Sequence, residues 1–141
     1  MKDMQLLQDL LFFEKESIET MQEEISITSD EKVLEVLEGM FQEHISQYNE
    51  IIGMIKKLNP QSTEKELPIT QEVEPSEEEI TTDEEMEEEL EDLLEETVMQ
   101  ISEYEGFAKE TENEEIRTMI TNFAQEEREH EEQLKKLIDS I

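Results

Sequence analysis

The sequence predicts an all-α protein: an antiparallel four-helix bundle of two helical hairpins joined by a long acidic crossover. Four stretches carry apolar residues every three or four positions, the period of a helix that buries one face. The 141 residues include only three Gly, three Pro and 5% aromatic residues, too few turn and strand formers for a β sandwich or barrel. Two short breaks and one long one separate the stretches, which indicates two hairpins and a crossover within one domain, residues 1–141.

The first hairpin is expected over residues 3–58. Its first helix extends to about residue 25, with an apolar stripe of Leu7, Leu10, Leu11, Ile18, Met21 and Ile25. Residues 28–30 supply a turn and an N-cap, and Glu31 lies in the capping-box position relative to Thr28. The stripe of the second helix comprises Val33, Leu37, Met40, Phe41, Tyr48, Ile51, Ile52 and Ile55. This helix is expected to end before Pro60, because proline disrupts helical hydrogen bonding.

Residues 59–82 contain all three prolines and no sustained apolar period, so we expect a solvated, self-repelling linker. Its 24 residues can extend roughly 80 Å, whereas the helices span only roughly 40 Å, so the linker can run the length of the bundle.

The second hairpin is expected over residues 83–141. Its first helix starts near Thr82, with Glu85 in capping-box position, and a short break at residues 111–113 starts the last helix. The two apolar stripes comprise Leu90, Leu93, Leu94, Val98, Ile101, Tyr104 and Ala108, then Ile116, Met119, Ile120, Phe123, Leu134, Leu137 and Ile138.

The net charge of −31 excludes the basic surface that binding to nucleic acid or to an anionic membrane requires. Residues 60–112 alone hold 21 acidic and two basic residues, and residues 72–96 hold 15 acidic and no basic residues. Three interpretations of this acidic run stay open. It is a solvated linker and helix start, part of a generally solubilised surface, or an element that mimics DNA or tethers a basic partner.

The composition excludes several other kinds of site. Without Cys there are no disulfides, thiolate metal sites or covalently attached haem. The methionines of the stripes serve as core filler rather than haem ligands, and no Gly-rich loop is present to bind a nucleotide. The longest uncharged apolar run near the N-terminus, residues 10–13, is too short for a signal peptide or a membrane helix, so a cytoplasmic protein is expected.

Four polar residues interrupt the apolar stripes: Glu14, His44, Glu127 and His130. Counted from the two hairpin turns, they lie 14 to 17 residues away, so all four fall near mid-height of the bundle. Each alone also fits a histidine or glutamate satisfied within the core. Their shared height indicates one common site, because a buried carboxylate is costly unless it is paired or metal-bound.

An offset of 86 residues places His44 on His130 and Glu14 on Gln100, so the hairpins look like an internal repeat. The stretches FAQEEREHEEQLKKL (123–137) and LLFFEKESIETM (10–21) resemble the ferritin-like superfamily, in particular rubrerythrin-type domains. The resemblance implies that each hairpin contributes a Glu from its first helix and a Glu-x-x-His from its second, and that these residues bind two irons.

Two positions depart from the family pattern. Phe41 stands where the Glu-x-x-His of the first hairpin should begin, and Gln100 stands where a Glu should lie. Glu103, one turn after Gln100, is a weaker substitute because it lies off the apolar face. The resemblance therefore implies a reduced set of metal ligands, with Glu14, His44, Glu127 and His130 retained.

The sequence thus favours a ferritin-like, rubrerythrin-like protein with a reduced Glu/His site. The site would bind iron or another divalent metal and serve Fe(II) oxidation by dioxygen or peroxide. Direct pairing of His and Glu without metal stays open, and the alternative function is a metal-free acidic bundle that acts as a structural or protein-interaction module. A homodimer, a hairpin-swapped dimer and a basic protein partner are the assemblies this pattern allows.

Overall fold

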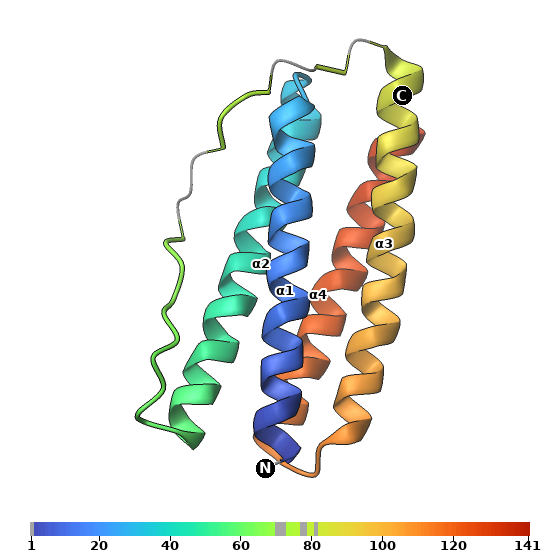
Figure 1. Ribbon diagram of the computed structural model, residues 1–141. Coiled ribbons are helices and arrows are strands. Elements are labelled where there is room, and N and C mark those ends of the chain that lie inside the picture. The colour runs from blue at the N-terminus through green and yellow to red at the C-terminus, as the bar shows by residue number, and fades with distance from the viewer. Residues whose placement is uncertain (1, 70–72, 77–78, 81) are drawn as a thin grey trace.

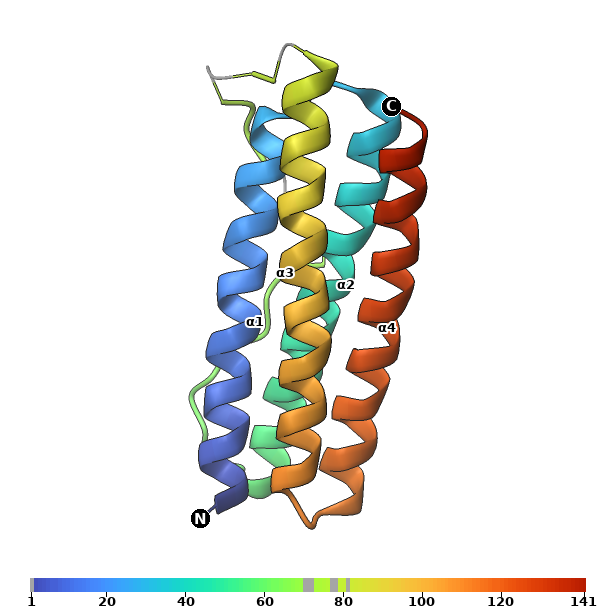
Figure 2. The same cartoon turned by 90° about the vertical axis from the view of Figure 1, so that its right-hand side faces the viewer.

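The computed structural model describes residues 2–69, 73–76, 79–80 and 82–141. These residues form four long helices and no strand: α1 (Lys2–Ile27), α2 (Glu31–Leu58), α3 (Asp83–Glu110) and α4 (Glu114–Asp139). Helix α1 packs on α2 and α3 packs on α4, which confirms the predicted four-helix bundle of two hairpins. The two hairpins contact each other along α1–α3 and α2–α4. In all four packed pairs the helices run antiparallel (Figures 1 and 2).

Side-chain caps fix three of the helix starts. The Asp30 carboxylate accepts hydrogen bonds from the backbone N–H groups of Lys32 and Val33, so Asp30 is the N-cap of α2. The capping box expected from Thr28 is wrong, because the Thr28 hydroxyl instead donates to the carbonyl of Glu24 in the preceding turn. Thr82 caps α3 as predicted, and Asn113 caps α4 with two hydrogen bonds from the helix backbone.

The described residues of the crossover between α2 and α3, 59–69, 73–76 and 79–80, lie along the outside of the bundle (Figure 1). The Asn49 side chain accepts from the Leu67 N–H and donates to the Leu67 carbonyl, at 2.7 and 2.9 Å. Leu67, Val73 and Ile80 also pack against the bundle core. The expectation of a fully solvated linker is therefore wrong at these residues; residues 70–72, 77–78 and 81 of the predicted linker lie outside the described part of the chain.

The apolar core consists of two clusters, one toward each end of the bundle. The first joins the N-terminal half of α1 to the C-terminal half of α2 and the N-terminal half of α4. The second is built around Ile18, Leu37, Phe41, Leu90 and Leu134. Along α1 and α4, the core residues before Glu14 and Glu127 belong to the first cluster and the core residues after them belong to the second. Both glutamates are 0% exposed and contribute polar atoms at mid-height. The fold therefore places a polar layer between two apolar clusters.

In the described part of the chain, no helix combines the length and the apolar character needed to cross a membrane.

A group of acidic side chains lies at the contact between α1 and α3. Burial raises the pKa of Glu24 on α1 to about 8, and the neighbouring α3 carboxylates of Glu89, Glu96 and Asp92 add to the shift. Since these groups all become anionic, the α1–α3 contact is strained electrostatically when the protein is fully ionised.

We expect the bundle to lose thermal stability as the pH rises from about 5 to about 8, because the folded state binds more protons than the unfolded chain in that window. The raised pKa of Glu24, about 8 against an ordinary 4.5, sets the sign. Glu24→Gln should flatten this dependence when melting temperatures are measured by circular dichroism across the window. Glu19→Gln, which removes the same charge from an exposed position of α1, should keep the wild-type slope. Equal slopes in the two variants would contradict the assignment.

Candidate metal centre

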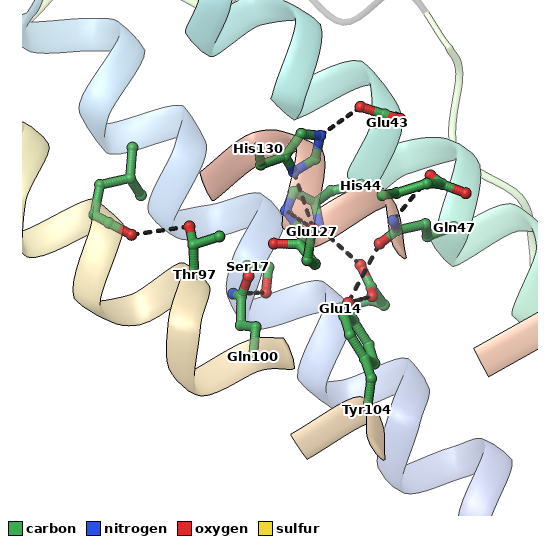
Figure 3. Close-up of polar contacts among 12 residues, drawn as sticks. Glu14, Ser17, Glu43, His44, Gln47, Thr97, Gln100, Tyr104, Glu127 and His130 are labelled. Atoms are coloured by element: carbon green, nitrogen blue, oxygen red, sulfur yellow. Dashed lines mark hydrogen bonds and ion pairs between the residues drawn. The ribbon is translucent and has the colours of Figure 1, made fainter. Parts of the chain in front are cut away.

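The structure brings the four predicted site residues into one connected group at mid-height, which we call the Glu/His cluster: Glu14, His44, Glu127 and His130 (Figure 3). Each comes from the buried face of its helix, Glu14 from α1, His44 from α2, and Glu127 and His130 from α4. The three-residue spacing of Glu127 and His130 sets them on one face of α4, one turn apart. Their role as metal ligands stays a prediction.

The His44 ring lies between two carboxylates. Its Nδ1 is 3.0 Å from Glu14 Oε2, and its Nε2 is 3.2 Å from Glu127 Oε1. The side chains of all three residues are nearly inaccessible to solvent. His44 therefore links α1 to α4 through two buried contacts.

The His130 ring also lies between two carboxylates. Its Nδ1 is 3.0 Å from Glu127 Oε1, and its Nε2 contacts the carboxylate of Glu43 on α2. The two imidazole rings lie 5.6 Å apart between centroids. One nitrogen of each ring thus points to the same oxygen, Glu127 Oε1, and the other nitrogen of each ring contacts an outer carboxylate.

The arrangement fits a metal ion. His44, Glu127 and His130 each offer a ligand atom, and these three atoms lie within 4.8 Å of one another. The second carboxylate oxygen, Glu127 Oε2, is buried and has no hydrogen-bond partner among the described residues. A buried polar atom without a partner is costly, and a bound cation would satisfy it. Imidazole and carboxylate are ligands that suit iron and other divalent transition metals.

Tyr104 on α3 completes the surroundings of Glu14. Its hydroxyl donates to Glu14 Oε1 and also lies 3.3 Å from the side-chain oxygen of Gln47. Its ring packs edge-on against Phe13 and Phe123, at 5.4 and 5.9 Å between centroids. Burial, and then the charge of Glu14, raises the pKa of Tyr104 well above its ordinary value, so the hydroxyl remains a donor.

Neither weaker candidate on α3 joins the cluster. Gln100 is buried, but its amide donates to the Ser17 hydroxyl at 2.7 Å. Glu103 is exposed and is not among the side chains that could hold a metal in the described part of the chain. Phe41, at the other departing position, is buried in the second apolar cluster.

The surroundings raise the pKa values of three members of the cluster: Glu14, His44 and His130. Burial acts to lower the pKa of His44, but the charges of Glu127 and Glu14 outweigh it and raise the pKa to about 9. The pKa of His130 is raised in the same way, since its contacts with Glu127 and Glu43 outweigh burial. Burial raises the pKa of Glu14, and its contacts with His44 and Tyr104 offset only part of that rise. A metal ion that binds here must displace protons from the histidines.

The sequence does not identify Glu43, and it places Tyr104 in an apolar stripe without predicting its contact with Glu14. Glu43 lies about 100° around α2 from His44, so the helical wheel places it on a flank rather than in the stripe. Only the packing of α2 on α4 shows that this flank faces His130. An acid immediately before a core histidine was the available signal, but it is a weak one in a chain with 42 acidic residues.

We expect Tyr104→Phe to lower the free energy of unfolding by about 1–3 kcal/mol, because it leaves a buried oxygen of Glu14 without its donor. Urea unfolding in the presence of a chelator measures this. Tyr48→Phe is the matched control, since half-buried Tyr48 lies outside the cluster and its ring packing is kept. An equal loss in both variants would show that the Tyr104 hydroxyl has no special role.

One of three comparisons with known families and proteins gives a match. The family model of rubrerythrin matches residues 42–138, which include His44, Glu127 and His130 but not Glu14 or Phe41. No significant match is found among curated proteins or among solved structures. The match covers more than half of the chain and spans three of its four helices. The chain therefore belongs to the rubrerythrin family, a family of ferritin-like di-iron carboxylate proteins.

Proposed function

We propose that this protein binds iron in the Glu/His cluster and catalyses the oxidation of Fe(II) by dioxygen or peroxide. One observation carries the proposal: two imidazole nitrogens and a buried carboxylate converge at mid-bundle, and the second oxygen of that carboxylate has no other partner among the described residues. Membership of the rubrerythrin family supports iron as the metal.

The residues divide into two roles. His44, Glu127 and His130 would hold the metal, since their ligand atoms are the ones that converge. Glu14 and Glu43 would orient the two rings, because each contacts the imidazole nitrogen that points away from Glu127. Bound iron supplies the one-electron chemistry between Fe(II) and Fe(III).

The chain itself shapes the chemistry around the metal. Tyr104 donates to Glu14 and fixes the carboxylate that orients His44. The apolar clusters above and below exclude bulk water and strengthen the electrostatic interactions within the layer. Displaced protons leave the histidines when the metal binds, so affinity should rise with pH.

A metal-free module is the second candidate function, and one observation favours it. Each histidine ring already has a carboxylate at both nitrogens, so His and Glu can satisfy one another directly. The cluster would then be an internal ion network of an acidic structural or interaction module.

Elemental analysis of protein purified without chelators, followed by anaerobic Fe(II) titration, tests the proposal. We expect bound metal in the wild type and loss of most of it in His130→Ala, because this change removes a ligand. Glu129→Ala, at an exposed neighbouring position of α4, should retain the metal. Exposure of the loaded wild type to dioxygen or peroxide should produce Fe(III) faster than an equal concentration of free Fe(II) does.

Metal content far below one ion per chain, with no difference between wild type and His130→Ala, would exclude the metal site and leave the metal-free module. Normal metal content without accelerated oxidation would retain binding and exclude the oxidase activity.

A further inference from the structure

We propose that the Glu/His cluster binds a single metal ion per chain, through His44, Glu127 and His130, in place of the two ions that the family's full ligand set holds. This inference rests on the proposed metal binding and specifies how many ions the site accepts. It depends on the residues of this chain that stand where the family pattern has ligands of the second metal ion.

The contacts define one position. His44 Nε2 and His130 Nδ1 approach the same oxygen of Glu127, at 3.2 and 3.0 Å. The remaining nitrogens are engaged by Glu14 and Glu43. Each ring therefore turns one nitrogen toward Glu127, and both of these nitrogens face that one carboxylate rather than two separate groups.

The buried charge also matches one divalent ion. Glu14 and Glu127 are the carboxylates of the cluster that are 0% exposed, and with neutral histidines they balance a charge of +2. Glu43 is 38% exposed and lies at the rim, where water screens it. A second dication would leave excess positive charge in a buried layer, which is strongly unfavourable.

The internal repeat identifies the residues that occupy the second position. The 86-residue offset places Phe41 on Glu127 and Gln100 on Glu14. Phe41 is 2% exposed and packs in the second apolar cluster. The Gln100 amide carries no charge and is engaged by Ser17. Both carboxylates that would complete a second ligand set are thus replaced by uncharged side chains.

The space beside Gln100 is correspondingly small. Ser17, Thr97, Gln100 and His44 contribute to the lining of a cavity of about 10 Å³, close to the least volume that holds one water molecule. Glu96 also lines this cavity, but it belongs to no group of three metal-ligating side chains in the described ranges. The cavity therefore suits a water molecule held by hydroxyl and amide groups.

The test is the stoichiometry of anaerobic Fe(II) binding, measured by calorimetry and by elemental analysis after gel filtration. The wild type should bind one ion. The double variant Phe41→Glu/Gln100→Glu should bind two, because it restores both missing carboxylates. Glu103→Gln, an exposed change one turn from Gln100, should leave the value at one. Loading with Mn(II) adds a spectroscopic readout, since the electron paramagnetic resonance hyperfine pattern of an isolated ion differs from that of an exchange-coupled pair.

The outcomes separate this inference from the proposed function. Two ions in the wild type, or the spectrum of a coupled pair, would overturn the single-ion site while supporting metal binding. No bound ion would overturn the proposed function itself. One ion in a double variant that circular dichroism shows to be folded would contradict the assignment of Phe41 and Gln100 as the residues that exclude the second ion. If the double variant does not fold, the wild-type stoichiometry and Mn(II) spectrum still decide the number of ions.

Discussion

The burial of Glu127 is the constraint on which the rest of this structure depends. A carboxylate with no exposed surface at the centre of an apolar bundle must find partners, and it contacts both histidines of the chain through one oxygen. Each histidine then requires its own outer carboxylate, Glu14 or Glu43, and Glu14 requires Tyr104. The network involves all four helices, so the two hairpins are joined by directed polar contacts at mid-height and by apolar packing toward each end.

The same constraint connects the fold to its chemistry. Under the proposed metal binding, the protons that this network holds would be displaced and its imidazole and carboxylate groups would become ligands. Phe41 and Gln100 are both buried and uncharged, so neither adds a negative charge to this layer. The large acidic excess acts elsewhere, as at Glu24, where carboxylates of α1 and α3 oppose one another. Net charge and buried charge therefore have different consequences in this protein: the first affects stability against pH, and the second organises the buried Glu/His network in which we propose metal binding.

The bundle and the shared height of Glu14, His44, Glu127 and His130 were predictable because helical period and residue rise fix both the buried face and the position along the axis. The number of residues between turn and site is a property of the sequence alone. The contact between Glu43 and His130 was not predictable, because it depends on which flank of α2 meets α4. The two hydrogen bonds between the Asn49 side chain and the Leu67 backbone were not predictable for a related reason. A proline-containing acidic segment has no apolar period that indicates what it packs against.

The most direct test of the metal centre is anomalous X-ray diffraction from crystals grown with Fe(II) under anaerobic conditions, recorded on both sides of the iron absorption edge. We predict an iron peak bounded by His44 Nε2, His130 Nδ1 and the Glu127 carboxylate, with Glu127 Oε2 among the ligands. The absence of an iron peak at the Glu/His cluster would contradict this prediction. Iron bound only at surface carboxylates, while the histidines stay paired with Glu127, would contradict it as well.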